Sequence, residues 1–109
     1  MARVKRGRLW AEAELRNREQ LARLGRELRS ARGRVRRTQE QIAARAGVGR
    51  LVVGRIERGV GATASLDAWQ RVALAVETPL VVKGDPLPPE QGLVWSDVQA
   101  TRLFAWRRR

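Results

Sequence analysis

Two short helical segments separated by only three residues constrain this chain more than any other feature of its sequence. Thr38 and Gln41 have the spacing of a capping box, with Thr38 as the N-cap. The box predicts a helix over 39–46, and Gly47 ends it because glycine readily adopts the left-handed conformation of a helix terminus. Since a second helical pattern follows at once over 50–58, the two helices must be joined by a tight turn.

Further helices are predicted on both sides of this pair. Apolar residues recur at helical spacing within 15–32, and Ser65 can cap a helix over 66–76. The apolar run 80–82 fits either a strand or a last helical turn. A linker with three prolines follows, and a second capping box at Ser96 predicts a final helix.

The sequence therefore predicts an all-α protein. We expect a compact bundle of about five helices, with an N-terminal helical and basic extension and a C-terminal extension. Its domains would be a basic arm over 1–14, a helical domain over 15–82, and a Pro-containing linker with an aromatic and basic segment over 83–109. The predicted core consists of apolar residues on the inner helix faces: Leu21, Leu24, Leu28, Ala31, Ile42, Ala43, Ala46, Val53, Ile56, Leu66, Trp69, Val72, Ala73 and Val76.

Charge and composition narrow the function. The chain has 23 basic and 11 acidic side chains, a net charge of +12, and neither cysteine nor histidine. The commonest metal ligands and the commonest general base are thus missing, so we expect no catalytic residue, no metal, no cofactor and no enzymatic activity. Because no apolar run could span a bilayer, we expect a cytoplasmic protein whose positive charge meets nucleic acid rather than membrane.

The helical pair and its flanks resemble the lambda-repressor-like (Cro/repressor, XRE-type) helix-turn-helix family. The resemblance covers about residues 24–80 and depends on several apolar, glycine and polar positions agreeing in spacing at once. These positions are Leu24, Gly25, Arg26, Glu27, Leu28, Arg32, Thr38, Gln39, Glu40, Gln41, Ile42, Ala43, Ala46, Gly47, Val48, Gly49, Arg50, Val53, Ile56, Glu57, Arg58, Gly59, Leu66, Trp69, Val72, Ala73 and Val76.

The resemblance implies roles for outward-facing residues. The second helix of the pair would enter the major groove and read bases through Arg50, Leu51 and Arg55. Contacts with backbone phosphates are implied for the start of the first helix and for nearby arginines: Gln39, Arg58, Arg34, Arg36 and Arg37. It also implies a structural ion pair between Arg32 and Glu57.

The chain departs from the family pattern at two places. Arg36 and Arg37 stand where the family usually has a glycine followed by an apolar residue, so we expect Val35 to fill the core there. Gly49 and Gly54 replace the usual hydroxylic residues, which removes a side-chain cap and a phosphate contact.

These features predict a small, repressor-like transcriptional regulator that binds specific double-stranded DNA as a homodimer. One alternative is the antitoxin of a toxin–antitoxin pair, in which the segment with Trp95, Phe104 and Trp106 would bind the toxin. Another alternative, favoured by the two glycines, is a nucleic-acid-binding module of low specificity. We otherwise expect the aromatic segment to cover the bundle, with a dimer interface as the alternative.

Overall fold

The protein is described from a computed structural model, in which residues 7–91 are placed. Its elements are α1 (Arg8–Val35), α2 (Gln39–Ala46), α3 (Arg50–Glu57), α4 (Leu66–Ala75) and a 3₁₀ turn η1 (Pro89–Gln91). The chain divides into two units, and the unit that contains the helical pair is Asn17–Val82. The all-α prediction is confirmed, with four α helices in the placed part of the chain.

Helix α1 begins earlier than the sequence predicted. It starts at Arg8 rather than Leu15, so the stretch assigned to a basic arm is helical from that residue on. The early turns carry no buried apolar stripe, and a periodicity argument therefore could not find them. Good helix formers and the pair formed by Arg16 and Glu12, 2.7 Å apart, support the helix there.

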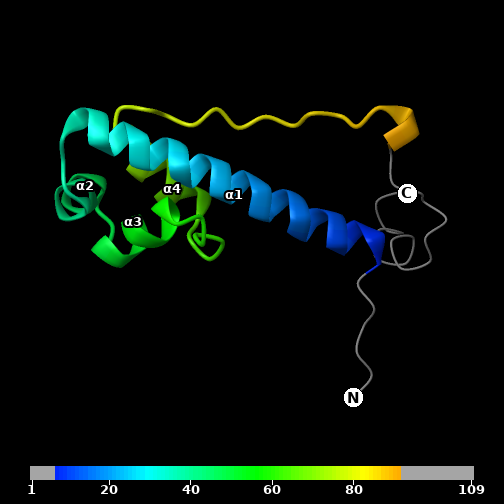
Figure 1. Ribbon diagram of the computed structural model, residues 1–109, viewed down its shortest axis with the longest axis horizontal. Coiled ribbons are helices and arrows are strands. Elements are labelled where there is room, and N and C mark those ends of the chain that lie inside the picture. The colour runs from blue at the N-terminus through cyan, green and yellow to red at the C-terminus, as the bar shows by residue number, and fades with distance from the viewer. Residues whose placement is uncertain (1–6, 92–109) are drawn as a thin grey trace, which may run out of the picture. The chain divides into compact units, whose positions relative to one another are not determined.

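In the unit Asn17–Val82, helices α2, α3 and α4 lie together against the C-terminal part of α1 (Figure 1). The core between them contains most of the predicted residues: Leu28, Ala31, Ile42, Ala43, Ala46, Val53, Ile56, Trp69, Val72, Ala73 and Val76, with Ala75 in addition. Leu21, Leu24 and Val35 pack against it and are partly buried, so Val35 fills the place expected of it.

One core prediction is wrong. Leu66 is 58% exposed, although its spacing from Trp69 and Val72 placed it on the apolar stripe. It is the first residue of α4, and its side chain lies beyond the end of the core. The stripe therefore starts one turn later, at Trp69, whose indole N–H donates to the carbonyl of Gly61 at 3.1 Å.

Helix α1 crosses the end of α3 at backbone contact distance. A Cβ atom at Gly25 would lie 2.4 Å from the carbonyl oxygen of Ile56, closer than real atoms approach. On the α3 side, Gly59 has φ +76°, and a Cβ there would lie 2.9 Å from Cα of Ala22. Two glycines thus let the first helix pack directly on the end of the third.

Residues 80–82, which follow α4, form neither a strand nor a helical turn. The Gln70 side chain holds this segment, because its amide donates to the Leu80 carbonyl at 3.0 Å and accepts from the Leu80 N–H at 3.2 Å. Val81 and Val82 are exposed, as are residues 83–90. The helix predicted from Ser96 and the aromatic residues Trp95, Phe104 and Trp106 lie outside the described residues. Within residues 7–91, no helix is long and apolar enough to cross a membrane.

The contact between α1 and α3 predicts opposite effects for two glycines of the same helix. Gly25→Ala should lower the free energy of unfolding by about 2 kcal/mol, because the new methyl group must push α1 and α3 apart. Gly33→Ala is the matched control, since a Cβ there meets nothing within 4 Å. It should raise the free energy of unfolding by about 0.5–1 kcal/mol. Urea unfolding followed by circular dichroism measures both, and equal effects would contradict the close contact.

Candidate nucleic-acid interface

Helix α2 begins and ends with the geometry that its sequence predicted. Thr38 and Gln41 form the full capping box, with the Gln41 N–H donating to the Thr38 hydroxyl at 3.1 Å and the Thr38 N–H donating to the Gln41 amide oxygen at 2.9 Å. Gly47 has φ +73°, which ends α2 in the left-handed region. Since α3 begins at Arg50, the turn is short and the two helices pack closely against each other.

Helix α3 has an inner and an outer face. Val53 and Ile56 are fully buried and fix the helix in the core. The three residues expected to read bases, Arg50, Leu51 and Arg55, are all exposed, and Leu51 is 68% exposed. The side chains of the two arginines make no hydrogen bond or ion pair with any other residue that the structure describes, so both guanidinium groups are open to a ligand.

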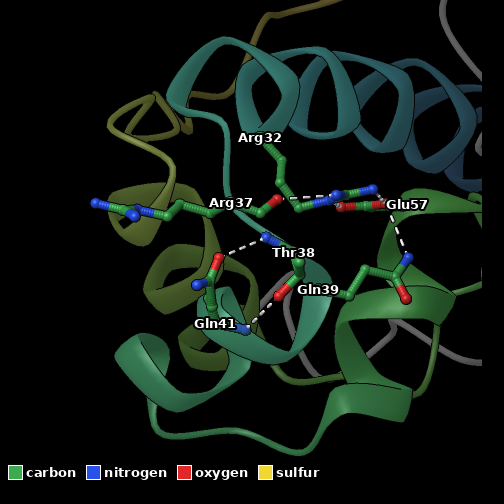
Figure 2. A network of polar contacts seen from close by, with 6 residues as sticks. All are labelled: Arg32, Arg37, Thr38, Gln39, Gln41 and Glu57. Atoms are coloured by element: carbon green, nitrogen blue, oxygen red, sulfur yellow. Dashed lines mark hydrogen bonds and ion pairs between the residues drawn. The ribbon is translucent and has the colours of Figure 1, made fainter.

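An ion pair joins the last turns of α1 to the end of α3 (Figure 2). Arg32 Nε donates to Glu57 Oε2 at 2.5 Å and Arg32 Nη2 donates to Glu57 Oε1 at 3.0 Å, in the two-point geometry of a guanidinium on a carboxylate. The Glu57 side chain is only 4% exposed and that of Arg32 21%. These are the two residues that the family resemblance paired.

Gln39 joins this pair, which sequence reasoning missed. Its side-chain amide donates to Glu57 Oε1 at 3.0 Å, so the carboxylate receives hydrogen bonds from both α1 and α2. A Cβ atom at Gly54 would lie 3.7 Å from the Gln39 amide oxygen and 3.2 Å from Arg58 Nη1. The two expected phosphate contacts, Gln39 and Arg58, therefore lie over the same glycine. The one sequence signal for this arrangement was Gly54, because a residue without a side chain leaves room for the Gln39 and Arg58 side chains above it.

The remaining expected phosphate contacts surround the turn between α1 and α2. Arg34, Arg36 and Arg37 are exposed, and their side chains have no hydrogen bond or ion pair to another described residue. The Arg37 carbonyl accepts from Arg32 Nη1 at 3.0 Å, while the Arg37 side chain points away from the network (Figure 2). The backbone of this turn is thus fastened to the buried ion pair.

Electrostatics keep the Glu57 carboxylate charged. Burial alone would raise the pKa of Glu57, but the hydrogen bonds from Arg32 and Gln39, together with the charges of Arg32 and Arg29, outweigh it and hold the pKa below its usual range. The hydrogen bond to Glu57 in turn raises the pKa of the Arg32 guanidinium. The one acidic residue of α3 is therefore buried and neutralised by Arg32, which leaves the outer face of the helix positive.

The lowered pKa of Glu57 predicts a loss of stability in acid. The pair contributes fully above the unfolded-state pKa of about 4.3, and the contribution disappears as pH falls through the lower pKa of the folded state. Urea unfolding between about pH 2 and pH 7 should show this loss in the wild type and in the exposed control Glu40→Gln. Glu57→Gln should be less stable by about 3 kcal/mol at pH 7 and should depend less on pH.

A direct titration covers the case in which Glu57→Gln does not fold. The ¹³C shift of the Glu57 carboxyl in the wild type should report a pKa below 4.3, the usual value of a glutamate. A value at or above that reference would contradict the ion pair as the stabilising contact.

Comparison with known protein families agrees with this geometry. A family model described as a helix-turn-helix domain matches residues 23–82, more than half of the chain. Neither the curated proteins nor the solved structures contain a significant match. The matched range begins within α1, ends after α4, and includes the glycine turn and every residue of the buried network. The chain therefore belongs to the helix-turn-helix domain family, and with it to a class of domains that bind DNA.

Proposed function

We propose that the protein is a transcriptional regulator that binds specific double-stranded DNA sites as a homodimer and acts as a repressor by occupying them. The observation that carries the proposal is the outer face of α3. Arg50, Leu51 and Arg55 are exposed there, on a helix whose inner residues are fixed in the core.

The chemistry of these three side chains suits the major groove. An arginine can donate two hydrogen bonds to O6 and N7 of a guanine, and a leucine can pack on a thymine methyl group. Because both guanidinium groups are free of partners among the described residues, neither must break an internal contact to bind a base. We assign guanine reading to Arg50 and Arg55 and a thymine contact to Leu51.

Phosphate contacts would set the orientation of α3 in the groove. Gln39 is already oriented by its hydrogen bond to Glu57 at 3.0 Å, and Arg58 lies beside it over Gly54. Side chains held in place before binding lose less conformational entropy on the DNA. The buried network therefore supports a defined docking geometry. A symmetric dimer would repeat this geometry on two half-sites and raise the affinity.

A second candidate function is binding with low sequence specificity. Gly49 gives α3 no side-chain cap, and Gly54 offers no side chain to the groove. Both glycines reduce the number of base and phosphate contacts that α3 can make, while the net charge of +12 would still attract any duplex. The ratio of specific to non-specific affinity separates this candidate from the first.

The site assignment predicts distinct losses for α3 and for a control arginine. With a duplex selected from a random pool, Arg50→Ala or Arg55→Ala should cost about 1–3 kcal/mol of binding free energy and relax one base position. Arg71→Ala, on α4, is the control for the loss of one charge and should cost far less. Fluorescence anisotropy on the selected and on a random duplex measures both. Equal losses of Arg55→Ala on the two duplexes would refute base reading by Arg55, and a specificity ratio near one in the wild type would favour the second candidate.

A further inference from the structure

The C-terminal half of α1 carries an open groove on a different face from the one that packs on α3. The groove has a volume of about 530 Å³ and is lined by polar and charged residues: Arg23, Arg26, Glu27, Ser30, Arg34 and Thr78. Five of the six belong to α1, at spacings of three and four that place them on one helix face, and Thr78 follows α4. We call this surface the α1 groove.

Helix α3 marks the opposite face of α1. A Cβ atom at Gly25 would collide with the end of α3, and Arg32 is paired with Glu57, so these two positions of α1 face α3. Arg23 lies two residues before Gly25, and Arg34 lies two residues after Arg32. Two residues turn a side chain by about 200° around the helix axis. The α1 groove and α3 are therefore on opposite sides of α1.

The α1 groove contains positive charge that the protein does not neutralise. Its one acid, Glu27, is paired with Arg23 at 3.1 Å. The side chains of Arg26 and Arg34 are exposed and make no hydrogen bond or ion pair with another described residue. Three arginines against one glutamate leave a net charge of +2, and Ser30 adds a hydroxyl group. The groove is thus suited to an anion.

The lining indicates the class of anion. Protein interfaces have an apolar core and small-molecule sites are mostly apolar, but none of the six lining residues is apolar. Guanidinium and hydroxyl groups are the donors that bind the DNA backbone. From Arg23 to Arg34 the groove follows α1 for about 16 Å, so a strand laid along it would present several phosphates. A nucleic-acid backbone therefore fits better than a peptide or a small effector.

We propose that the α1 groove binds the phosphate backbone of a second DNA duplex, so that one chain holds two duplexes at once. The inference rests on the proposed binding of a first duplex by α3 and goes beyond it, because it adds a contact without sequence preference on another face. The phosphate contact that the family resemblance implies for Arg34 would then be made to this second duplex. A chain bound at its specific site would join that site to a distant segment of DNA.

Co-capture of two duplexes tests the inference. A selected duplex is fixed to beads, the full chain is added, and retention of a labelled random duplex of about 30 base pairs is measured at about 0.1 M salt. The wild type should retain the labelled duplex. Arg23→Gln combined with Arg26→Gln should reduce retention at least about tenfold, because each lost phosphate contact costs about eightfold at this salt concentration. Its affinity for the selected duplex, measured by fluorescence anisotropy, should change less than about twofold.

Two further variants control for charge. Arg45→Gln combined with Arg71→Gln also removes two exposed arginines, from α2 and α4 outside the groove, and should keep retention within about twofold. Arg23→Lys combined with Arg26→Lys keeps both charges and should retain the labelled duplex, since lysine also binds phosphate. Both groove positions are exposed, so all variants should melt with the wild type in circular dichroism.

The outcomes separate this inference from the function on which it rests. Unchanged retention in the groove variant overturns the inference and assigns bridging to a dimer whose two α3 helices hold different duplexes. An equal loss in the control variant, or an equal loss of affinity for the selected duplex, also overturns it. A wild type that binds the selected duplex but retains no second duplex overturns the inference and leaves the proposed function standing. A wild type that binds no duplex overturns the proposed function itself.

Discussion

The ion pair between Arg32 and Glu57 is the contact on which the rest of the structure depends. It is the point at which α1, α2 and α3 are tied together, because Glu57 also accepts from Gln39 and Arg32 also donates to the Arg37 carbonyl. A carboxylate this deeply buried is tolerated only with such partners. The pair therefore fixes geometry more than it adds stability: it sets the end of α3, the start of α2 and the turn that precedes it.

Close backbone packing complements this polar network. Gly25 and Gly59 allow α1 to lie directly on the end of α3, so the polar contacts formed by Arg32 span a short distance. The two features act on the same helix end, one through shape and the other through charge. Together with buried Val53 and Ile56, they leave α3 with a single free surface, the outer face that carries Arg50, Leu51 and Arg55.

Much of the fold followed from local signals in the sequence. The capping box at Thr38, the cap at Ser65 and the left-handed Gly47 are each determined within a few residues, so α2 and α4 begin where the sequence predicted. The pairing of Arg32 with Glu57 came from the family resemblance, because no local signal links residues that far apart in the chain. The outward position of the three α3 residues followed from helical periodicity once Val53 and Ile56 were assigned to the core.

The parts that the sequence did not predict are those that depend on tertiary contacts or on their absence. The first turns of α1 have no apolar stripe, so only propensity and ion pairs indicate them. Leu66 has the right spacing for the core but lies past its edge. Gln39 appeared only as a phosphate contact, because its distance from Glu57 is set by how α2 packs on α3.

The two hydrogen bonds between the Gln70 side chain and the Leu80 backbone lie at the end of the folded unit Asn17–Val82. A side-chain amide there offers one donor and one acceptor to Leu80, as a neighbouring strand would, and no sheet is needed to satisfy that backbone. The polypeptide thus leaves the helices at a position set by one glutamine. The exposed side chains of Val81 and Val82 directly after Leu80 mark the end of the unit Asn17–Val82.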